Sequence, residues 1–206
     1  MCNTTFKYVW FMRHGKTEID IESMEYEEFM EHLSNGMDVP LAHQHGIDCT
    51  ELPKTIDLLC HSDYKRATQT AQIICDHIDV KAVMQLPSLR EVKFDKQLIR
   101  KEEYKYLAGN RVDILNRWYD NQNWSESFDY SFNRAREIEA FIMTRPEKYI
   151  LLISHGFFLR ILELYFMQGK RTGISRAELL GIEPLLFGQF FYQRVKPSFE
   201  SIECIS

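Results

Sequence analysis

Short, mostly apolar runs recur along the chain, and polar or charged side chains follow each of them. The runs cover residues 8–12, 56–60, 80–86 and 149–153. Apolar runs of this length are typical of strands that are buried on both faces of a sheet. The pattern therefore predicts four buried strands, and the first and the last of them are each followed by a His-Gly pair.

Between these runs, apolar residues recur every three or four positions, as they do on the buried face of a helix. This spacing predicts helices near residues 67–78, 130–144 and 157–167. Ser62 or Asp63 is available to cap the first of these helices, and Asp129 the second. Strands that alternate with helices predict an α/β fold, a three-layer sandwich in which helices flank a mainly parallel central sheet.

Length and composition limit the class of protein. The 206 residues can form one well-buried core, so we expect a single domain over residues 1–206. A net charge of -5 argues against a general nucleic-acid binder. The five cysteines form no Cys-x-x-Cys pair, so we expect reduced thiols rather than disulfides or a zinc site. Without an apolar leader or a membrane span, we expect a soluble cytoplasmic protein that binds no membrane.

Two charged segments interrupt the alternation of strands and helices. Residues 18–31 are rich in acid, whereas residues 93–117 are rich in base and are interleaved with tyrosines. Charge runs are most often solvated helical faces, and that is the simpler interpretation. The alternative is a helical lid over about residues 93–124, in which Arg100 and Arg111 would select anionic substrates.

Each predicted strand is followed closely by residues that can act on a phosphate group. These are Arg13 and His14 after the first strand, Ser62, Asp63 and Arg66 after the second, Arg90 and Glu91 after the third, and His155 after the last. The carboxyl ends of parallel strands meet at one edge of a sheet, where ligands bind. Phosphoryl transfer needs cations, hydrogen-bond donors, an in-line nucleophile and an acid for the leaving oxygen. This set meets those needs without a metal.

The residue types suggest a role for each side chain. A neutral imidazole is a competent nucleophile, and nearby Arg13 and Arg66 would help to keep His14 neutral. The two guanidinium groups also match the geometry of phosphate. A protonated His155 could donate to a non-bridging oxygen, and Glu91 could protonate the leaving alkoxide and then activate water.

Taken singly, these residues have simpler interpretations. A strand-end histidine is often structural, Arg66 alone is an ordinary helix-start arginine, and Glu91 alone is a surface carboxylate. We interpret His43, His45 and His61 as loop histidines, not ligands. No His-x-x-x-His or His-x-Glu spacing supports a metal site. The phosphate-site prediction therefore depends on the whole set.

Four segments carry a family resemblance. They are Arg-His-Gly-Lys-Thr-Glu at 13–18, Ser-Asp-Tyr-Lys-Arg-Ala-Thr-Gln-Thr-Ala at 62–71, Leu-Arg-Glu at 89–91 and Ser-His-Gly-Phe-Phe-Leu-Arg at 154–160. In these motifs and in their order, the chain resembles the histidine phosphatase superfamily, the phosphoglycerate-mutase-like proteins. Together the motifs span most of the chain and are highly specific.

The resemblance implies a phosphohistidine intermediate on His14 and a proton donor at Glu91, with no cofactor and no metal. It implies a doubly wound α/β core and a phosphate pocket that comprises Arg13, His14, Arg66 and His155, with Thr17 and Gly156 beside them.

The chain also departs from the family pattern. A Gly-x-x-Asp-x-Pro-Leu-Thr-x-x-Gly stretch normally follows soon after the first motif, but here residues 38–46 match it only in part and arrive late. Pro53 then interrupts the expected helix. Asp20 stands where the family often has Asn, and residues 94–97 replace a Gly-x-x-Glu-Gly run. We therefore expect the substrate-contacting part of the site to be unusual.

The leading hypothesis is a metal-independent phosphoric monoester hydrolase of the histidine acid phosphatase type, acting through phospho-His14. Its partner would be a small phosphorylated substrate or a phosphoprotein. A phosphomutase would use the same catalytic residues, although the short chain and its different substrate loops favour hydrolysis. A phosphate- or phosphoprotein-binding module without turnover is the third hypothesis, but it would not need the acid Glu91.

Overall fold

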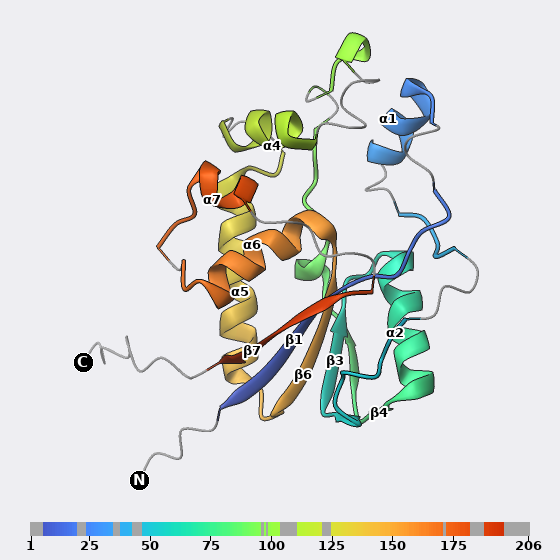
Figure 1. The fold of residues 1–206 in the computed structure, drawn as a ribbon, viewed down its shortest axis with the longest axis vertical. Coiled ribbons are helices and arrows are strands. Elements are labelled where there is room, and N and C mark those ends of the chain that lie inside the picture. Colours follow the sequence, from blue (N-terminus) through green and yellow to red (C-terminus); the bar gives the residue numbers. More distant parts are fainter. Residues whose placement is uncertain are drawn as a thin grey trace.

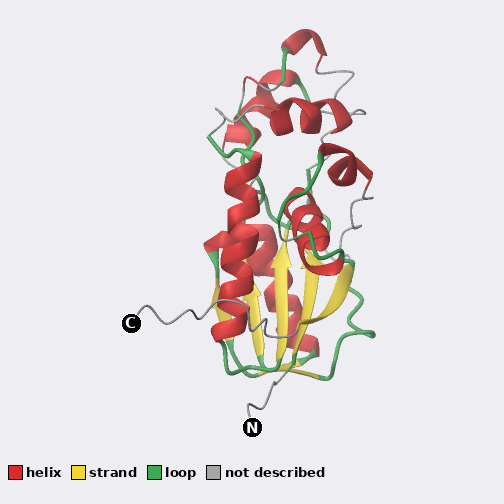
Figure 2. Cartoon of the chain, turned by 90° about the vertical axis from the view of Figure 1, so that its left-hand side faces the viewer, coloured by secondary structure: helices red, strands yellow, loops and turns green. Residues whose placement is uncertain are grey.

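The computed structural model describes residues 6–19, 24–34, 38–42, 47–95, 97, 99–103, 111–120, 125–170, 172–181 and 188–195. A central sheet lies between helices on its two faces, and further helices lie above the carboxyl ends of its strands (Figures 1 and 2). The strands of the sheet are, in spatial order, β5 (Val83–Gln85), β3 (Leu58–His61), β6 (Tyr149–Ser154), β1 (Lys7–Arg13) and β7 (Phe190–Val195).

The prediction of a mainly parallel sheet within an α/β sandwich is confirmed. β1 pairs in parallel with β6, β6 with β3, and β3 with β5. The sequence prediction missed β7, which pairs antiparallel with β1 at one edge of the sheet. Its exposed and half-buried residues alternate, so it lacks the continuous apolar run that identified the other strands.

Two predicted strands are divided in the structure. The run at 56–60 becomes β2 (Thr55–Ile56) and β3, and the run at 80–86 becomes β4 (Asp79–Val80) and β5. β2 and β4 pair with each other in a small separate sheet. The first division falls at Asp57, whose carboxylate accepts a hydrogen bond from the backbone N–H of Tyr149 at 2.9 Å. A single polar side chain thus interrupts an otherwise apolar strand.

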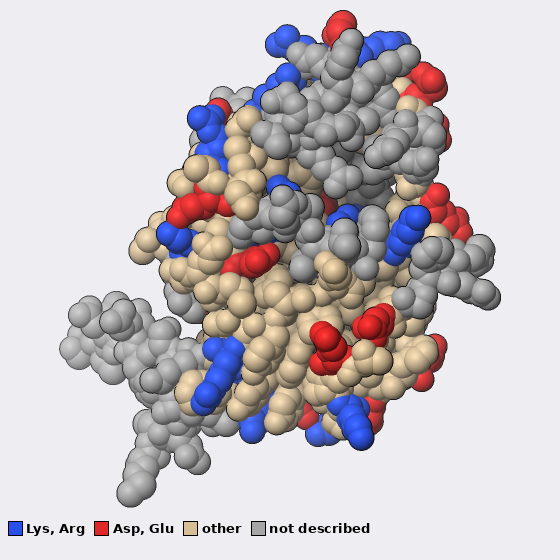
Figure 3. Space-filling model, in the orientation of Figure 1, with Lys and Arg blue, Asp and Glu red and all other residues tan. Residues whose placement is uncertain are grey.

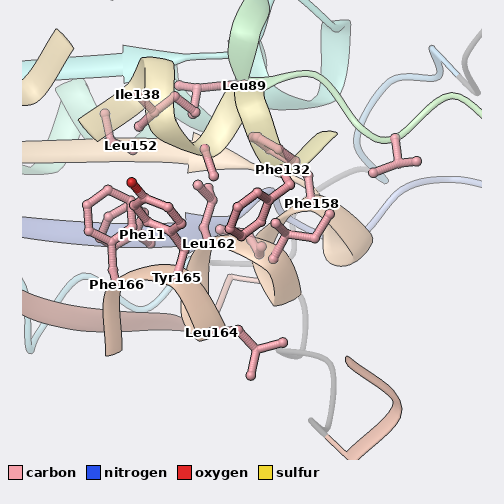
Figure 4. Close-up of a cluster of buried hydrophobic side chains, with 14 of the residues drawn as sticks. Phe11, Leu89, Phe132, Ile138, Leu152, Phe158, Leu162, Leu164, Tyr165 and Phe166 are labelled. Carbon is pink, nitrogen blue, oxygen red and sulfur yellow. The ribbon is translucent and has the colours of Figure 1, made fainter. Parts of the chain in front are cut away.

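The two faces of the sheet bury alternate residues of each strand. On one face, α2 (Lys65–His77) covers Met12, Leu59 and Ile153. On the other, α5 (Phe128–Thr144) and α6 (Gly156–Met167) cover a larger cluster. Figure 4 shows that cluster, in which Phe11 and Leu152 from the strands meet side chains of both helices. The sheet is therefore a rigid platform for the residues at its carboxyl edge.

The predicted helices are present, but two caps differ from expectation. Neither Ser62 nor Asp63 caps α2; its N-cap is Tyr64, and the carboxylate of Asp38 accepts a hydrogen bond from the backbone N–H of Lys65. α5 begins at Phe128, and the hydroxyl of Ser127, not Asp129, accepts from the backbone N–H of Tyr130. In both cases the side chain that accepts the hydrogen bond lies earlier in the sequence than the predicted capping residue.

The charged segments contribute to a cap, by which we mean α1 (Tyr26–Ser34), the 3₁₀ turn η4 (Lys101–Glu103) with the preceding residues 99–100, and α4 (Arg111–Asp120). The cap lies above the carboxyl ends of the strands (Figures 1 and 2). α7 (Arg176–Gly181) packs beside α4. The small turn η2 (Pro87–Leu89) leads from the sheet towards this end.

Charge pairing and apolar burial both hold the cap together. The Tyr26 hydroxyl donates to the carbonyl of Ile99 at 3.1 Å, and the exposed side chains of Glu27 and Lys101 form an ion pair. Phe29, Met30, Ile99, Leu115 and Trp118 belong to one buried cluster. Positive and negative side chains are interspersed at this end of the surface (Figure 3). The charges therefore face solvent, as the simpler interpretation expects, while the apolar sides of the same segments are packed.

Residues 104–110 and the Arg111 side chain, on which part of the lid prediction depends, lie outside the described residues. In the part of the chain that the structure describes, no helix is long and apolar enough to cross a membrane.

Candidate active site

The sheet delivers His14 and His155 to the same place. β1 and β6 are neighbours, and Arg13 at the end of one strand is in register with Ser154 at the end of the other. His14 directly follows Arg13, and His155 directly follows Ser154. The backbone N–H of His14 donates to the carbonyl of Ser154 at 3.1 Å. The two imidazole centroids are 5.0 Å apart, and both side chains are buried. The pairing predicted from the two His-Gly runs is therefore present.

The hydrogen bonds of His14 fix its tautomer. Nδ1 lies 2.7 Å from the carbonyl oxygen of Gly15, which can only accept, so Nδ1 carries the proton. Nε2 then has a lone pair, and it accepts a hydrogen bond from Nε of Arg66 at 3.1 Å. His14 therefore presents an unprotonated nitrogen to the site.

The same reasoning assigns the opposite tautomer to His155. Its Nδ1 accepts from Nε of Arg66 at 3.1 Å, so the proton resides on Nε2. That nitrogen lies 2.7 Å from the hydroxyl oxygen of Ser62 and donates to it. Ser62, fully buried, thus orients the second histidine, a role that its place after the strand did not reveal.

Arg66 lies at the centre of this arrangement. A single N–H of its guanidinium is shared between Nε2 of His14 and Nδ1 of His155, and the residue is buried. The guanidinium carbon also lies 4.9 Å from the ring centroid of Tyr64, whose edge packs against His155. Because Arg66 occupies the first turn of α2, the packing of that helix against the sheet determines its position.

The electrostatic environment keeps both imidazoles neutral. Burial lowers the pKa of His14 well below 6.5, and the charges of Arg66 and Arg13 lower it further. Burial and Arg66 also lower the pKa of His155 well below 6.5. Both shifts disfavour the imidazolium form, which agrees with the tautomers assigned from the hydrogen bonds.

Thr70 connects the loop of His14 to the helix that carries Arg66. Its buried hydroxyl accepts from the backbone N–H of Gly15 at 3.0 Å and donates to the carbonyl of Arg66 at 2.7 Å. The residue belongs to the motif at 62–71, but its residue type and position in the sequence do not indicate a role. It fixes the distance between His14 and Arg66.

Arg13 packs directly against Gly156. A methyl group added to Gly156 would lie 3.2 Å from Cζ of Arg13 and 3.4 Å from its Nε and Nη2. The glycine therefore leaves room for the guanidinium beside the first turn of α6. This contact explains why a glycine follows His155, and it brings Arg13, as predicted, next to both histidines.

Glu91 lies at the N-terminus of α6. Its Oε1 accepts from the backbone N–H groups of Val92 at 2.9 Å and Phe158 at 3.0 Å, and its Oε2 accepts from Phe157 at 3.1 Å. Burial lowers the pKa of Arg66, and the nearby negative charge of Glu91 opposes that shift, so the carboxylate lies close enough to act on the guanidinium between the two histidines. The helix N-terminus thus holds the predicted acid in a fixed orientation.

The segment that arrives late in the sequence is close to the first motif in space. Thr17 forms a β-bridge with Leu41, and the backbone N–H of Ala42 donates to the carbonyl of Lys16 at 2.9 Å. Residues 38–42 therefore lie beside the first motif despite the interval that contains α1. Thr17 is half-buried in this bridge, whereas Asp20, another residue of interest, lies outside the described residues.

The remaining histidine predictions have mixed outcomes. His61 is not a loop residue: it ends β3, is buried, and its Nδ1 lies 2.7 Å from the Ser62 carbonyl. His43 and His45 lie outside the described residues. Within the described ranges, no group of three or more His, Cys, Asp or Glu side chains is arranged to hold a metal ion.

Sequence reasoning also missed a buried ion pair between Glu126 and Arg134 beneath the Glu91 loop. One signal was present in the sequence. Arg134 lies on the apolar stripe of α5, beside Ala135 and one turn before Ile138, where a charged residue is unexpected.

Comparisons with known proteins agree with this geometry. The sequence model of the histidine phosphatase superfamily (branch 1) matches residues 9–183. A protein of Schizosaccharomyces pombe described as a probable phosphatase is 26% identical over 171 residues, which are 76% of this chain and 77% of that protein.

Solved structures share the fold at low sequence identity. Mycobacterial hydrolase 1 is 16% identical, with a TM-score of 0.61 over 95% of this chain and 99% of that chain. A mycobacterial glucosyl-3-phosphoglycerate phosphatase is also 16% identical, with a TM-score of 0.55 over 91% of this chain and 89% of that chain. At these identities the agreement concerns the fold alone.

The lowered pKa values of the two histidines lead to a direct prediction. Because burial and Arg66 depress both, His14 and His155 should remain neutral as the pH falls through about 6.5, where an ordinary histidine becomes protonated. Nitrogen and carbon chemical shifts of the imidazoles, followed by NMR from pH 8 to pH 5, measure this. A short histidine-containing peptide in the same buffer serves as the reference. Titration of either buried histidine near or above that of the peptide would contradict the assignment.

The contact between Arg13 and Gly156 leads to a second prediction. Gly156→Ala should push the guanidinium aside and raise the inhibition constant of inorganic phosphate by about tenfold, or ~1.4 kcal/mol. The matched control is Gly173→Ala, because an added methyl group there has no neighbour within 4 Å. Unchanged phosphate inhibition in Gly156→Ala would show that Arg13 does not need this position to bind phosphate.

Proposed function

The chain belongs to the histidine phosphatase superfamily, and on that premise we propose that it hydrolyses phosphomonoesters through a phosphohistidine on His14. The observation that carries the proposal is the lone pair on Nε2 of His14. This nitrogen is unprotonated and lies next to Arg66, and the pKa of the His14 imidazole is lowered well below 6.5. A neutral imidazole held among cationic groups is suited to attack a phosphorus atom whose oxygens those groups bind.

In the first step, Nε2 of His14 attacks phosphorus and the bond between phosphorus and the ester oxygen breaks. Arg13 and Arg66 bind the non-bridging oxygens, and Arg66 exchanges its hydrogen bonds to the imidazoles for bonds to the phosphoryl group. Glu91 must carry a proton in this step, and it takes up that proton when the anionic substrate binds. The departing alkoxide takes the proton from Glu91 and leaves as the free alcohol.

In the second step, the Glu91 carboxylate removes a proton from a water molecule, whose oxygen attacks the phosphohistidine. The bond between phosphorus and Nε2 breaks, inorganic phosphate leaves, and Glu91 regains its proton. His155 lies beside Arg66 with its lone pair on Nδ1, so it donates from that nitrogen only after it takes up a proton with the anionic substrate. The charge that Mg²⁺ supplies in other phosphoryl-transfer enzymes comes here from the two arginines, so the reaction proceeds without a metal.

The lowered pKa of His14 supports the proposal that this activity is of the acid-phosphatase type. An ordinary histidine loses its lone pair below about pH 6.5, whereas His14 keeps it to lower pH. A nucleophile that survives in moderately acidic solution supports catalysis there.

For the substrate we propose a multiply charged phosphomonoester. The solved structure named as a glucosyl-3-phosphoglycerate phosphatase acts, by its name, on a phosphate ester that carries a second anionic group. In this chain the cap lies above the carboxyl edge of the sheet and exposes Arg100. We therefore propose that the cap acts as the lid predicted for about residues 93–124 and binds the distal part of the substrate.

The covalent step predicts a phosphoenzyme. During turnover, phosphate that is labile to acid and stable to base should accumulate on His14, as rapid quenching and mass spectrometry would detect. His14→Ala should lose at least about a thousandfold in kcat, because the intermediate cannot form. Near-normal hydrolysis by this variant would refute the mechanism. Transfer of the phosphoryl group to a second hydroxyl rather than to water would identify a mutase instead.

The lid proposal predicts a selective change in KM. Arg100→Ala and Arg111→Ala should raise KM about tenfold for a sugar bisphosphate and leave p-nitrophenyl phosphate nearly unchanged, since that molecule offers nothing distal to bind. Arg176→Ala is the matched control, because that guanidinium pairs with Asp120. Equal, small effects on both substrates would show that the arginines are only part of a solvated surface.

A further inference from the structure

The loop that carries Glu91 is held from below by groups outside the catalytic set. On one side of Glu91, Nη2 of Arg134 donates to the carbonyl of Ser88 at 2.9 Å and also to the carbonyl of Arg90. On the other side, Oε2 of Glu126 accepts from the backbone N–H of Lys93 at 2.9 Å. The loop is therefore fixed immediately before and shortly after the catalytic carboxylate.

Glu126 and Arg134 form one unit. Nη1 of Arg134 and Oε1 of Glu126 make an ion pair, and both residues are buried. The same carboxylate oxygen accepts from the hydroxyl of Ser131 at 2.7 Å. Most of the other hydrogen bonds of this pair go to the backbone of residues 88–93, so its contacts are concentrated on the Glu91 loop. We call Glu126 and Arg134 the brace.

The brace also reaches the other end of the Glu91 side chain. The guanidinium carbon of Arg134 lies 4.0 Å from the ring centroid of Phe158. The backbone N–H of Phe158 is the group that donates to Oε1 of Glu91 at 3.0 Å. Arg134 thus contacts both the loop from which Glu91 extends and the residue that orients its carboxylate.

Stability alone explains this arrangement poorly. Desolvation of two buried charges often costs as much as their attraction returns, so a buried ion pair is weak evidence for a stabilising role. A catalytic acid, in contrast, loses much of its effect when it is displaced by about 1 Å. Rigid hydrogen bonds to the backbone on both sides of Glu91 are what such a group requires.

We propose that Glu126 and Arg134 are positioning residues, which hold Glu91 where it protonates the leaving group. The inference rests on the proposed hydrolysis and on the role of Glu91 in it. Neither residue touches the substrate; both act through the loop at 88–93 and through Phe158. Loss of the brace therefore removes the contribution of the acid and leaves the phosphate pocket intact.

The test compares two leaving groups. An alkyl phosphate needs a proton on its departing oxygen, whereas p-nitrophenyl phosphate leaves as a stabilised anion and needs little help. Arg134→Lys keeps the charge but loses the forked donor, and Glu126→Gln keeps an acceptor but loses the charge. Each should lower kcat for the alkyl phosphate about 10- to 100-fold and change p-nitrophenyl phosphate less than about threefold. Inhibition by inorganic phosphate should stay unchanged in Arg134→Lys, because that variant keeps the positive charge that acts on His155.

Two further sets of variants separate positioning from folding. The double variant Glu126→Met with Arg134→Met replaces the buried pair by apolar side chains, which such sites tolerate, and it should still show the leaving-group difference. Ser127→Ala destabilises α5 by removing its cap, and Arg136→Lys makes the same exchange as Arg134→Lys at the surface of that helix. Both control variants should leave the ratio of the two substrates unchanged.

The outcomes distinguish this inference from the function on which it rests. If Glu91→Gln shows the leaving-group difference and the brace variants do not, the brace has no positioning role and the inference is wrong. The same holds if the brace variants lose activity equally on both substrates, or if Ser127→Ala reproduces their difference. If Glu91→Gln itself shows no difference, Glu91 is not the acid, and both the inference and that part of the mechanism fail.

Discussion

One guanidinium group, that of Arg66, organises the site. Its Nε–H is shared between the lone pairs of two imidazoles, and burial together with the charge of Arg66 keeps both of them neutral. The other contacts serve this arrangement. Thr70 fixes the distance between Arg66 and the loop of His14, and Ser62 orients His155. The parallel pairing of β1 and β6 brings the two histidines together. Burial makes each contact stronger than it would be in water.

This arrangement has a consequence for catalysis. The hydrogen bond from Arg66 occupies the lone pair on Nε2 of His14, the nucleophile of the proposed reaction, and a phosphoryl oxygen would compete for the same donor. Binding of substrate would therefore both uncover the nucleophile and place Arg66 on the charge that it must stabilise. Preorganised donors of this kind need little rearrangement at the moment of reaction.

Much of the fold, and the residues that meet at the candidate site, could be predicted from the sequence, because both leave local signals. Buried strands appear as apolar runs, and the residues after them, such as His14 and His155, occupy one edge by topology alone. Edge strand β7 was missed because half-buried strands lack such a run. The contact of Asp38 with the start of α2 and the brace of Glu126 and Arg134 depend on chain segments that meet only after folding. The cap by Ser127 is local, and it was missed because α5 begins at Phe128, two residues before the predicted start. Segment 38–42 appeared displaced in the sequence, although it lies beside Thr17 in space.

A structure of the protein with orthovanadate would show whether His14 is the nucleophile and Arg66 the group that binds the transferred phosphoryl, since vanadate adopts the five-coordinate geometry of phosphoryl transfer. We expect a bond between vanadium and Nε2 of His14. Arg66 should then donate to an equatorial oxygen instead of the imidazole, and the apical oxygen opposite His14 should face Glu91. Vanadium bound to His155, or held without a bond to either histidine while Arg66 keeps its present hydrogen bonds, would refute both roles.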